Sequence, residues 1–372
     1  MPDEVRPQSA PRTDRPGPDG HGRAQPPRWR RARPPVLTAL AVLLLLIAGV
    51  LAVLYELTPP SATPRQVTFE VKPGWGGKDV AAALAVDGLV RNARIFELYL
   101  RARRLDRSIG EGLYDLSPSM SAPQVAAALE KGGRPRTVQV VIPEGLRARR
   151  IAERLAAAGL GAEDTYLALI DRPGDLRPGF VPAGDGLEGY LFPASYDIPV
   201  KSTPKQALQL MLQRFGEELT PGINDRLRAR GMSVRGWVTL ASMVQAEAAG
   251  PGEMPVIAGV FLNRLDLGMA LQSDPTVAYG LHKALPDLKA EDLHKDTPWN
   301  TYTRAGLPAG PIDSPGDAAL QAVLEPVRTD ARGQRYLYFL HAEENGKTVF
   351  RPNTSLRAHN QDVRRYLQGN AP

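Results

Sequence analysis

The feature that most constrains this chain is an uncharged apolar run of twenty residues, Val36 to Tyr55. At a rise of about 1.5 Å per residue, a helix of that length covers about 30 Å, the thickness of the hydrocarbon core of a bilayer. Arginines crowd its N-terminal side, whereas Glu56 follows it and the next basic residue is Arg65. Because basic flanks stay cytoplasmic, the pattern predicts a single-pass anchor with a cytoplasmic N-terminus and everything after Leu57 outside.

A cleaved signal peptide is the alternative interpretation of the same run. The run is longer than the usual apolar core of a signal peptide, and no A-x-A site follows it before Pro59 and Pro60. We therefore expect an uncleaved helix in the inner membrane. The chain has no Cys, so the extracytoplasmic part must fold without disulfides.

The basic surplus of the chain, 46 Lys and Arg minus 40 Asp and Glu, is six, and much of it lies in the first 35 residues. Residues 1–35 hold eight Arg and four acids and are rich in Pro and Gly, so they are predicted to be disordered. A nucleic-acid-binding arm is the other interpretation. Arginine beside a membrane segment already has a topological cause, and we expect no nucleic-acid partner.

The extracytoplasmic part contains a pattern that occurs twice. A strand, a turn glycine and a helix recur 71 residues apart, and each helix closes fourteen residues after its glycine, from Gly74 to Gly88 and from Gly145 to Gly159. Matching offsets around two glycines indicate two similar β-turn-α units, although two copies are weak support for a true duplication.

The predicted fold class is α+β with three parts. After the transmembrane helix (36–55) and a Pro-containing linker (56–66), residues 67–136 form a small β-α-α-β subdomain, and residues 137–372 form a mixed α/β domain around a central helix. Small modules of this order often grip glycan chains, as LysM-like domains do. A spacer that lifts the rest of the chain off the membrane is an equal alternative.

The central helix is predicted over Ser233 to Pro251. Ser233 is a good N-cap, and Gly250 before Pro251 is a good stop. Apolar residues at spacings of three and four give the helix one buried face, and Glu247 lies on or beside that face in the last turn. Burial and the helix C-terminus both disfavour a charged carboxylate, so the pKa of Glu247 should be raised, as a general acid requires. An exposed Glu at a fraying helix end is the alternative.

Polar and glycine-rich clusters surround this helix in the sequence. Their amide, hydroxyl and carboxylate groups suit a surface that hydrogen-bonds a polar ligand such as a glycan. A structural role is the alternative for each; Asp274 before Pro275, for example, is typical of a helix N-cap with Pro at the first position. The candidate substrate-binding residues are Glu188, Asn263, Gln272, Asp274, Asn300 and Thr301.

Other common catalytic motifs are missing from the sequence. It contains no Cys nucleophile, G-x-S-x-G, P-loop or H-E-x-x-H motif, and its five His have no metal-ligand spacing. We expect no metal and no cofactor. A glycosidase that uses two carboxylates would need a partner for Glu247, and Glu188, Glu253 and Asp274 are the candidates.

Several motifs in one order resemble the YceG-like endolytic murein transglycosylases, the MltG type, over roughly residues 67–368. Many members carry an E-x-E pair in the central helix, where this chain has Gln245 and Glu247, so the resemblance places the catalytic glutamate at Glu247. The motifs that carry the resemblance are LASMVQAEA (240–248), FLNRL (261–265), LQSDPTVAYG (271–280), NTYT (300–303), GLPAGPI (306–312) and YLYF (336–339), with Thr354 and His359-Asn360.

The resemblance implies a reaction and partners. Members cleave the β-1,4 bond between N-acetylmuramic acid and N-acetylglucosamine inside peptidoglycan strands and leave 1,6-anhydro-muramyl ends. Glu247 would act first as acid and then as base on the muramyl 6-hydroxyl, so a second carboxylate to activate water is unnecessary. Synthases of the penicillin-binding class are the implied partners. A non-catalytic glycan-binding scaffold and a lysozyme-like hydrolase remain the alternatives.

Overall fold

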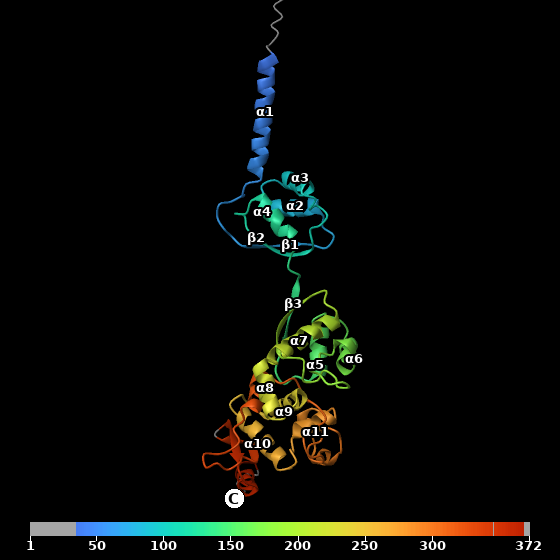
Figure 1. Ribbon diagram of the computed structural model, residues 1–372, viewed down its shortest axis with the longest axis vertical. Helices are drawn as coiled ribbons and strands as arrows, with labels where there is room; N and C mark the ends of the chain where they lie inside the picture. The colour runs from blue at the N-terminus through green and yellow to red at the C-terminus, as the bar shows by residue number, and fades with distance from the viewer. Residues whose placement is uncertain (1–34, 345, 368–372) are drawn as a thin grey trace, which may run out of the picture. The chain divides into compact units, whose positions relative to one another are not determined.

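The computed structural model describes residues 35–344 and 346–367 (Figure 1). The tail that is predicted to be disordered lies outside the described residues, apart from Pro35. The chain divides into two compact units, the first comprising residues 1–110 and 114–132 and the second residues 111–113 and 133–372. The expected mixed α/β class with one N-terminal apolar helix is confirmed.

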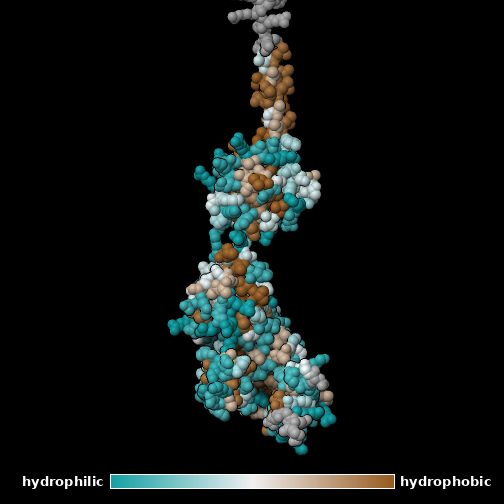
Figure 2. All heavy atoms as spheres, turned by 180° about the vertical axis from the view of Figure 1, so that it is seen from behind, coloured by the Kyte–Doolittle hydropathy of each residue, from teal (hydrophilic) through white to brown (hydrophobic). Residues whose placement is uncertain are grey.

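Helix α1 (Pro35–Glu56) contains the apolar run. Within the described residues it is the one helix long and apolar enough to cross a membrane. Its leucines and valines are exposed, and Figure 2 shows them as a continuous apolar column. A helix that is apolar on all sides and that the other described residues do not cover is suited to a lipid environment, because exposing this much apolar surface to water is unfavourable.

The first unit has the predicted β-α-α-β order, followed by one more helix. Its strands pair with each other, and its helices bury Leu84, Phe96 and Val125 in one core. The LysM likeness itself stays a prediction. The elements are β1 (Val67–Val71), α2 (Gly77–Val86), α3 (Ala93–Ala102), β2 (Gly112–Leu116) and α4 (Ala122–Glu130).

The predicted linker between α1 and β1 is held against the first unit along part of its length. Leu57 packs on the core of the unit, and its carbonyl accepts the N–H of Ala122 at 3.0 Å. The N–H of Ser61 donates to the carbonyl of Pro118 at 3.0 Å. These contacts fix where α1 meets the unit.

The second unit begins with the other β-turn-α pattern. Strand β3 pairs antiparallel with β4, which lies in a stretch that the sequence pattern predicts to be a loop. The turn glycines of both patterns, Gly74 and Gly145, have φ of 81° and 73°, and both helices close at a glycine with positive φ. The local repeat is therefore real. The elements here are β3 (Thr137–Ile142), α5 (Ala148–Ala157), α6 (Glu163–Asp171), η1 (Gly174–Leu176), β4 (Ala194–Pro199), α7 (Pro204–Glu218) and α8 (Pro221–Ala229).

Helix α9 (Val234–Glu247) is the centre of the second unit. Ser233 caps it as predicted, accepting the N–H of Gly236 at 3.1 Å. Eight consecutive residues, Trp237 to Val244, are buried, so the helix is covered on all sides and not on one face alone. It ends at Glu247 with Ala248 extended, three residues before the predicted glycine stop at Gly250.

The remaining elements pack around α9 and its C-terminal end. Helices α10, α11 and α12 contact it directly. β5 and β6 form an antiparallel hairpin, as the strand-like runs 335–341 and 347–350 on either side of the turn pair 345–346 predict; residue 345 lies outside the described residues. Their bounds are α10 (Met254–Asp266), α11 (Asp274–Gly280), η2 (Leu285–Asp287), η3 (Ala290–His294), α12 (Asp317–Leu324), β5 (Tyr338–Glu344), β6 (Lys347–Asn353), α13 (Leu356–Asp362) and η4 (Val363–Leu367).

The close packing of α10 gives a stability prediction. A Cβ added at Gly259 would lie 2.0 Å from the backbone oxygen of Val327, whereas one added at exposed Gly222 in α8 meets nothing nearer than 4.0 Å. We expect Gly259→Ala to lower the free energy of unfolding by about 1–3 kcal/mol through overpacking. Gly222→Ala should raise it by about 0.5–1 kcal/mol through helix propensity. Urea unfolding of the full chain in detergent, followed by circular dichroism, measures both; equal effects would contradict the packing argument.

Candidate active site

The carboxyl group of Glu247 lies where α9 meets the loop before α11. Glu247 is the last residue of α9 and is part-buried. Its Oε1 accepts a hydrogen bond from the Ser273 hydroxyl at 2.6 Å. Ser273 is the N-cap residue of α11, so the predicted capping role of Asp274 shifts by one position, and Asp274 becomes the first residue of that helix. The side chain of Asp274 is thereby left free to face the surface.

Burial raises the pKa of Glu247 to about 7, and the negative charge of Asp274 acts in the same direction. The Ser273 hydrogen bond and the positive charges of His341 and Arg264 oppose this shift. Burial is thus the largest cause, as expected; the other cause that raises the pKa is the charge of Asp274, while the expected effect of the helix C-terminus stays a prediction. A carboxyl balanced near neutral pH can both give and take a proton.

Arg264 holds the loop before α11 against the hairpin. It is buried, donates from Nε to the carbonyl of Leu337 at 2.7 Å and from Nη1 to that of Leu271 at 2.8 Å. Its guanidinium also lies 5.1 Å from the centre of the Tyr338 ring. Backbone carbonyls therefore satisfy this cation near Glu247, and no carboxylate neutralises it through a direct contact within the described residues.

Gln272 and Asp274 are the two candidate binding residues that the structure places at the surface beside Glu247. Gln272 has a φ of 52°, a left-handed conformation that is costly for a residue with a side chain. Thr301 holds this conformation, since its carbonyl accepts the Gln272 N–H at 3.1 Å and its hydroxyl accepts the Ser273 N–H at 3.0 Å. The Tyr302 hydroxyl donates to Asp274 at 2.6 Å.

Asn263, Asn300 and Thr301 are buried. The Asn263 amide donates to two backbone carbonyls, both at 2.8 Å, and accepts from Arg328 at 2.9 Å. Asn300 likewise bonds backbone groups through both amide atoms. These bonds make the three residues braces for the loops around the site. Their direct contact with substrate stays a prediction.

A Glu–His pair follows directly after α9. Glu253 accepts the Ala249 N–H at 3.0 Å, and the same oxygen, Oε2, lies 2.8 Å from Nε2 of His341. The pair therefore ties the segment after α9 to β5. From the sequence, Glu253 was only a candidate second carboxylate for Glu247, and His341 had no predicted role. The contact between them could not be predicted, because 88 residues separate the two.

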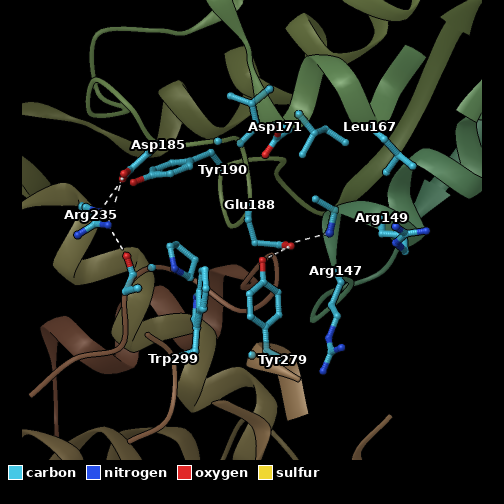
Figure 3. Close-up of a pocket in the computed structure, with 18 of the residues that line it drawn as sticks. Arg147, Arg149, Leu167, Asp171, Asp185, Glu188, Tyr190, Arg235, Tyr279 and Trp299 are labelled. Atoms are coloured by element: carbon cyan, nitrogen blue, oxygen red, sulfur yellow. Dashed lines mark hydrogen bonds and ion pairs between the residues drawn. The ribbon is translucent and has the colours of Figure 1, made fainter. Parts of the chain in front are cut away.

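Glu188 lines a cavity of about 680 Å³ that is separate from the Glu247 site, since Glu247 does not line it (Figure 3). Its two oxygens accept the Ala148 N–H at 2.9 Å and the Tyr279 hydroxyl at 3.1 Å. Burial raises the pKa of Glu188 to about 7. The carboxyl of Asp313 is also buried, with one oxygen unpartnered, and burial raises its pKa well above its usual range.

Aromatic and basic side chains form the rest of this cavity. The Tyr279 and Trp299 rings have centroids 5.5 Å apart, and the Arg147 guanidinium lies 5.3 Å from the centre of the Tyr279 ring. On the opposite side in Figure 3, Arg235 pairs with Asp185 at 2.6 Å. Aromatic faces with fixed polar groups around them can hold a sugar or another polar ring.

Helix α11 lies between the Glu247 site and the Glu188 cavity. Ser273, just before it, contacts Glu247, and Tyr279, near its end, contacts Glu188. Six residues of helix rise about 9 Å, so the two carboxyl groups are held at opposite ends of one short helix.

The wall of the cavity between residues 281 and 299 is held by charge. Asp292 is fully buried and contacts Nζ of Lys283 at 2.6 Å and Nζ of Lys295 at 2.7 Å. The N–H of Lys289 also donates to it at 2.9 Å. These hydrogen bonds, with that from Lys283 first, hold the pKa of Asp292 well below its usual range.

No group of three or more His, Asp or Glu side chains lies close enough to hold a metal ion in residues 35–344 and 346–367.

The sequence profile of the YceG-like family matches residues 69–365. The chain belongs to the YceG-like family. The relationship predicted from the motifs is confirmed, and the match covers the first unit from β1 onward as well as the residues around Glu247.

This YceG-like chain is similar to curated and solved proteins over most of its length. A protein of Streptococcus pneumoniae serotype 2 named endolytic murein transglycosylase is 30% identical in an alignment of 354 residues, and the match covers 86% of this chain and 63% of the relative. A Bacillus subtilis protein with the same name is 28% identical in an alignment of 314 residues, and the match covers 81% of this chain and 85% of the relative. This chain thus spans less than two thirds of the streptococcal relative.

A yceG-like protein of Listeria monocytogenes has a crystal structure with a TM-score of 0.52 to this chain at 31% identity. The match covers 80% of this chain and 99% of the Listeria chain. The fold described above is therefore shared with an experimentally observed member of the family.

The hydrogen bond at Glu247 gives a prediction about its titration. Ser273→Ala removes a donor that stabilises the carboxylate, so the pKa of Glu247 should rise above about 7. Carboxyl ¹³C chemical shifts of Glu-labelled protein measure it, with Glu247→Gln to assign the signal. Ser242→Ala is the matched control, because that hydroxyl donates to the carbonyl of Thr239 and not to Glu247. An unchanged or lower pKa in Ser273→Ala would refute the role of this bond.

Proposed function

We propose that this YceG-like chain is a membrane-anchored endolytic peptidoglycan transglycosylase with Glu247 as its catalytic residue. The observation that carries the proposal is a part-buried carboxyl with a pKa of about 7, held by Ser273 beside the exposed side chains of Gln272 and Asp274. The names of the streptococcal and Bacillus relatives support the substrate, the glycan strand of murein.

The first step is protonation of the leaving oxygen. Below pH 7 the neutral form of Glu247 dominates, and its proton passes to the glycosidic oxygen as the bond to C1 of the muramyl residue breaks. The leaving sugar departs as an alcohol, and C1 develops oxocarbenium character. The carboxylate of Asp274, whose charge already acts on Glu247, is available to stabilise this positive charge.

The second step closes the product ring. Glu247, now a carboxylate, removes the proton of the muramyl 6-hydroxyl as that oxygen attacks C1, which gives the 1,6-anhydro product and returns Glu247 to its neutral form. The Ser273 hydrogen bond and the charges of Arg264 and His341 favour the carboxylate. They therefore stabilise the charged form of Glu247 that the first step produces and the second step uses.

The cavity at Glu188 is proposed as a second contact for the same strand. It lies at the far end of α11 from Glu247, and it offers the Trp299 and Tyr279 rings beside Arg147 and the carboxyl of Glu188. Binding a strand on a site beyond the cleaved bond is what endolytic action requires, because the enzyme must grip the chain away from its ends. Contacts of Gln272 and Asp274 with N-acetyl groups belong to the same proposal.

Anchoring and partners complete the proposal. Helix α1 would span the inner membrane with the N-terminus in the cytoplasm, since the arginines precede it and the folded units follow it. The first unit is proposed to bind glycan in the manner of a LysM-like domain. Synthases of the penicillin-binding class are the proposed partners that supply nascent strands.

Digestion of purified peptidoglycan by the full chain in detergent tests the function. We expect products with anhydro-muramyl ends, detected by mass, and a loss of at least about a hundredfold in rate for Glu247→Gln, because the amide cannot donate the proton. The folded state of that variant is checked by circular dichroism. Reducing ends in the products would favour a lysozyme-like hydrolase, and no cleavage by folded wild-type protein would favour a glycan-binding scaffold.

The alkaline limb of the pH–rate profile tests the acid. Activity should decline as pH rises through about 7, because Glu247 loses the proton that it must donate. In Asp274→Asn this limb should move to lower pH, since the negative charge that raises the pKa is gone. A limb that stayed in place, or that moved upward, would contradict the electrostatic account.

Trp299→Ala tests the second contact. Removal of a ring from the cavity should raise KM about tenfold, a loss of about 1.4 kcal/mol of binding, with a smaller change in kcat. Leu285→Ala is the control, since Leu285 is an exposed apolar residue of the same segment that does not line the cavity. Equal KM values for the two variants would remove the cavity from the substrate path.

A further inference from the structure

The first unit is attached directly to the end of the apolar helix. The Arg91 guanidinium lies 4.6 Å from the centre of the Tyr55 ring at the end of α1 and donates to the carbonyl of Pro59 at 2.7 Å. Leu57, which packs on the core of the unit, is bonded through its carbonyl to the start of α4 at Ala122. If α1 spans the bilayer, as proposed above, Tyr55 lies at its interface and the unit follows without a free spacer.

Helix α3 begins at this junction. Asn92, the residue after Arg91, caps it by accepting the N–H groups of Arg94 and Ile95 at 3.0 and 3.2 Å. Figure 1 shows α3 at the end of the first unit where α1 enters. The helix therefore lies at the level where lipid headgroups would meet the protein.

The exposed side of α3 and the turn after it is strongly basic. Residues 91–107 contain six Arg against two acids. Arg91 is engaged at the junction and Arg101 pairs with Glu97 at 2.6 Å. The other four arginines are exposed and have no carboxylate partner within the described residues; they are Arg94, Arg103, Arg104 and Arg107.

An apolar side chain lies among these charges. Leu98 is 61% exposed and follows Arg94 by four residues, on the same face of α3. The other apolar side chains of the helix, Phe96 and Leu100, are buried in the core of the unit. Leu98 is thus a large apolar group that the fold directs away from its own core, between cations.

Arg104 occupies a position that usually belongs to glycine. Its φ is 59°, and it closes α3 in a motif in which the N–H of Leu105 bonds the carbonyl of Leu100 at 2.9 Å. Helices α2 and α5 close in the same way, with Gly88 and Gly159 at the equivalent position. A guanidinium retained where the backbone favours glycine is an outlier that points to a role for the charge.

We propose that this surface, the α3 surface formed by Arg94 and Leu98 of the helix and by Arg103, Arg104 and Arg107 after its end, binds the anionic phospholipid headgroups of the outer leaflet. Guanidinium groups pair well with phosphate, and Leu98 fits the boundary between headgroups and acyl chains. The occupant is lipid and not a soluble polyanion, because the exposed Leu98 has no partner on a polyanion and α1 already holds the face at the bilayer. Binding would fix the first unit in one orientation on the membrane.

The absence of Cys from the chain makes a direct test possible. Leu98→Cys carries an environment-sensitive fluorophore in the full chain, reconstituted in vesicles of phosphatidylcholine with or without phosphatidylglycerol. Lys131→Cys is the control, because this exposed residue follows the far end of α4, about 13 Å along the helix from the junction at Ala122. We expect blue-shifted emission and quenching by spin-labelled lipid at position 98 in the anionic vesicles, and neither at position 131.

Removal of the charges completes the test. Each Arg→Gln change among Arg94, Arg103, Arg104 and Arg107 should shift the equilibrium between lipid-bound and free α3 surface about fivefold toward the free form in the anchored chain. High salt should also favour the free form. Solvent-like emission at position 98 in both kinds of vesicle, with protein that floats with the vesicles, overturns the inference alone. Protein that fails to float overturns the anchoring on which it rests. A shift caused by soluble poly(glycerol phosphate) but not by anionic lipid overturns it in favour of a wall polyanion.

Discussion

The hydrogen bond from Ser273 to Glu247 is the contact on which the site depends. It joins the end of the buried helix α9 to the start of α11, and it brings a carboxyl out of bulk water without leaving it unpaired. Burial favours the neutral carboxyl and the hydroxyl favours the charged one, so neither form is strongly preferred near pH 7. A group in this balance changes its protonation at little cost in either direction, which is the property that a single acid–base residue needs.

The surroundings of this contact are rigid for reasons that differ from segment to segment. The core around Trp237 fixes α9, and backbone carbonyls bonded by Arg264 and Asn263 fix the loop and hairpin beside it. Thr301 holds Gln272 in a left-handed conformation that the chain would otherwise avoid. Buried polar residues around the site, such as Asn263, Arg264 and Thr301, thus mainly hydrogen-bond to backbone groups.

Local patterns in the sequence were sufficient for the apolar helix, the capped helix α9, the two β-turn-α units and the C-terminal hairpin. They also drew attention to Glu247 as an acid in the last turn of an apolar helix, but they left an exposed Glu as the alternative, and its catalytic role was predicted from the family resemblance. Strand β4 and helices α6, α8 and α12 were not predicted, because tertiary packing and not a strong periodicity of apolar residues defines them. Ser273 and the Glu253–His341 pair could not be found, because each contact joins residues that are distant in sequence.

Asp292, in the ion-paired segment beside the cavity, titrates in a different pH range from Glu188 and Glu247. Asp292 remains charged far below the range in which Glu188 and Glu247 take up protons, because two lysines and a backbone N–H hold its carboxylate. Stability from such a group is present above its ordinary pKa and is lost only when pH falls through its depressed one. Acidification through neutral pH therefore changes the charge of Glu188 and Glu247 while the ion pairs of Asp292 stay intact.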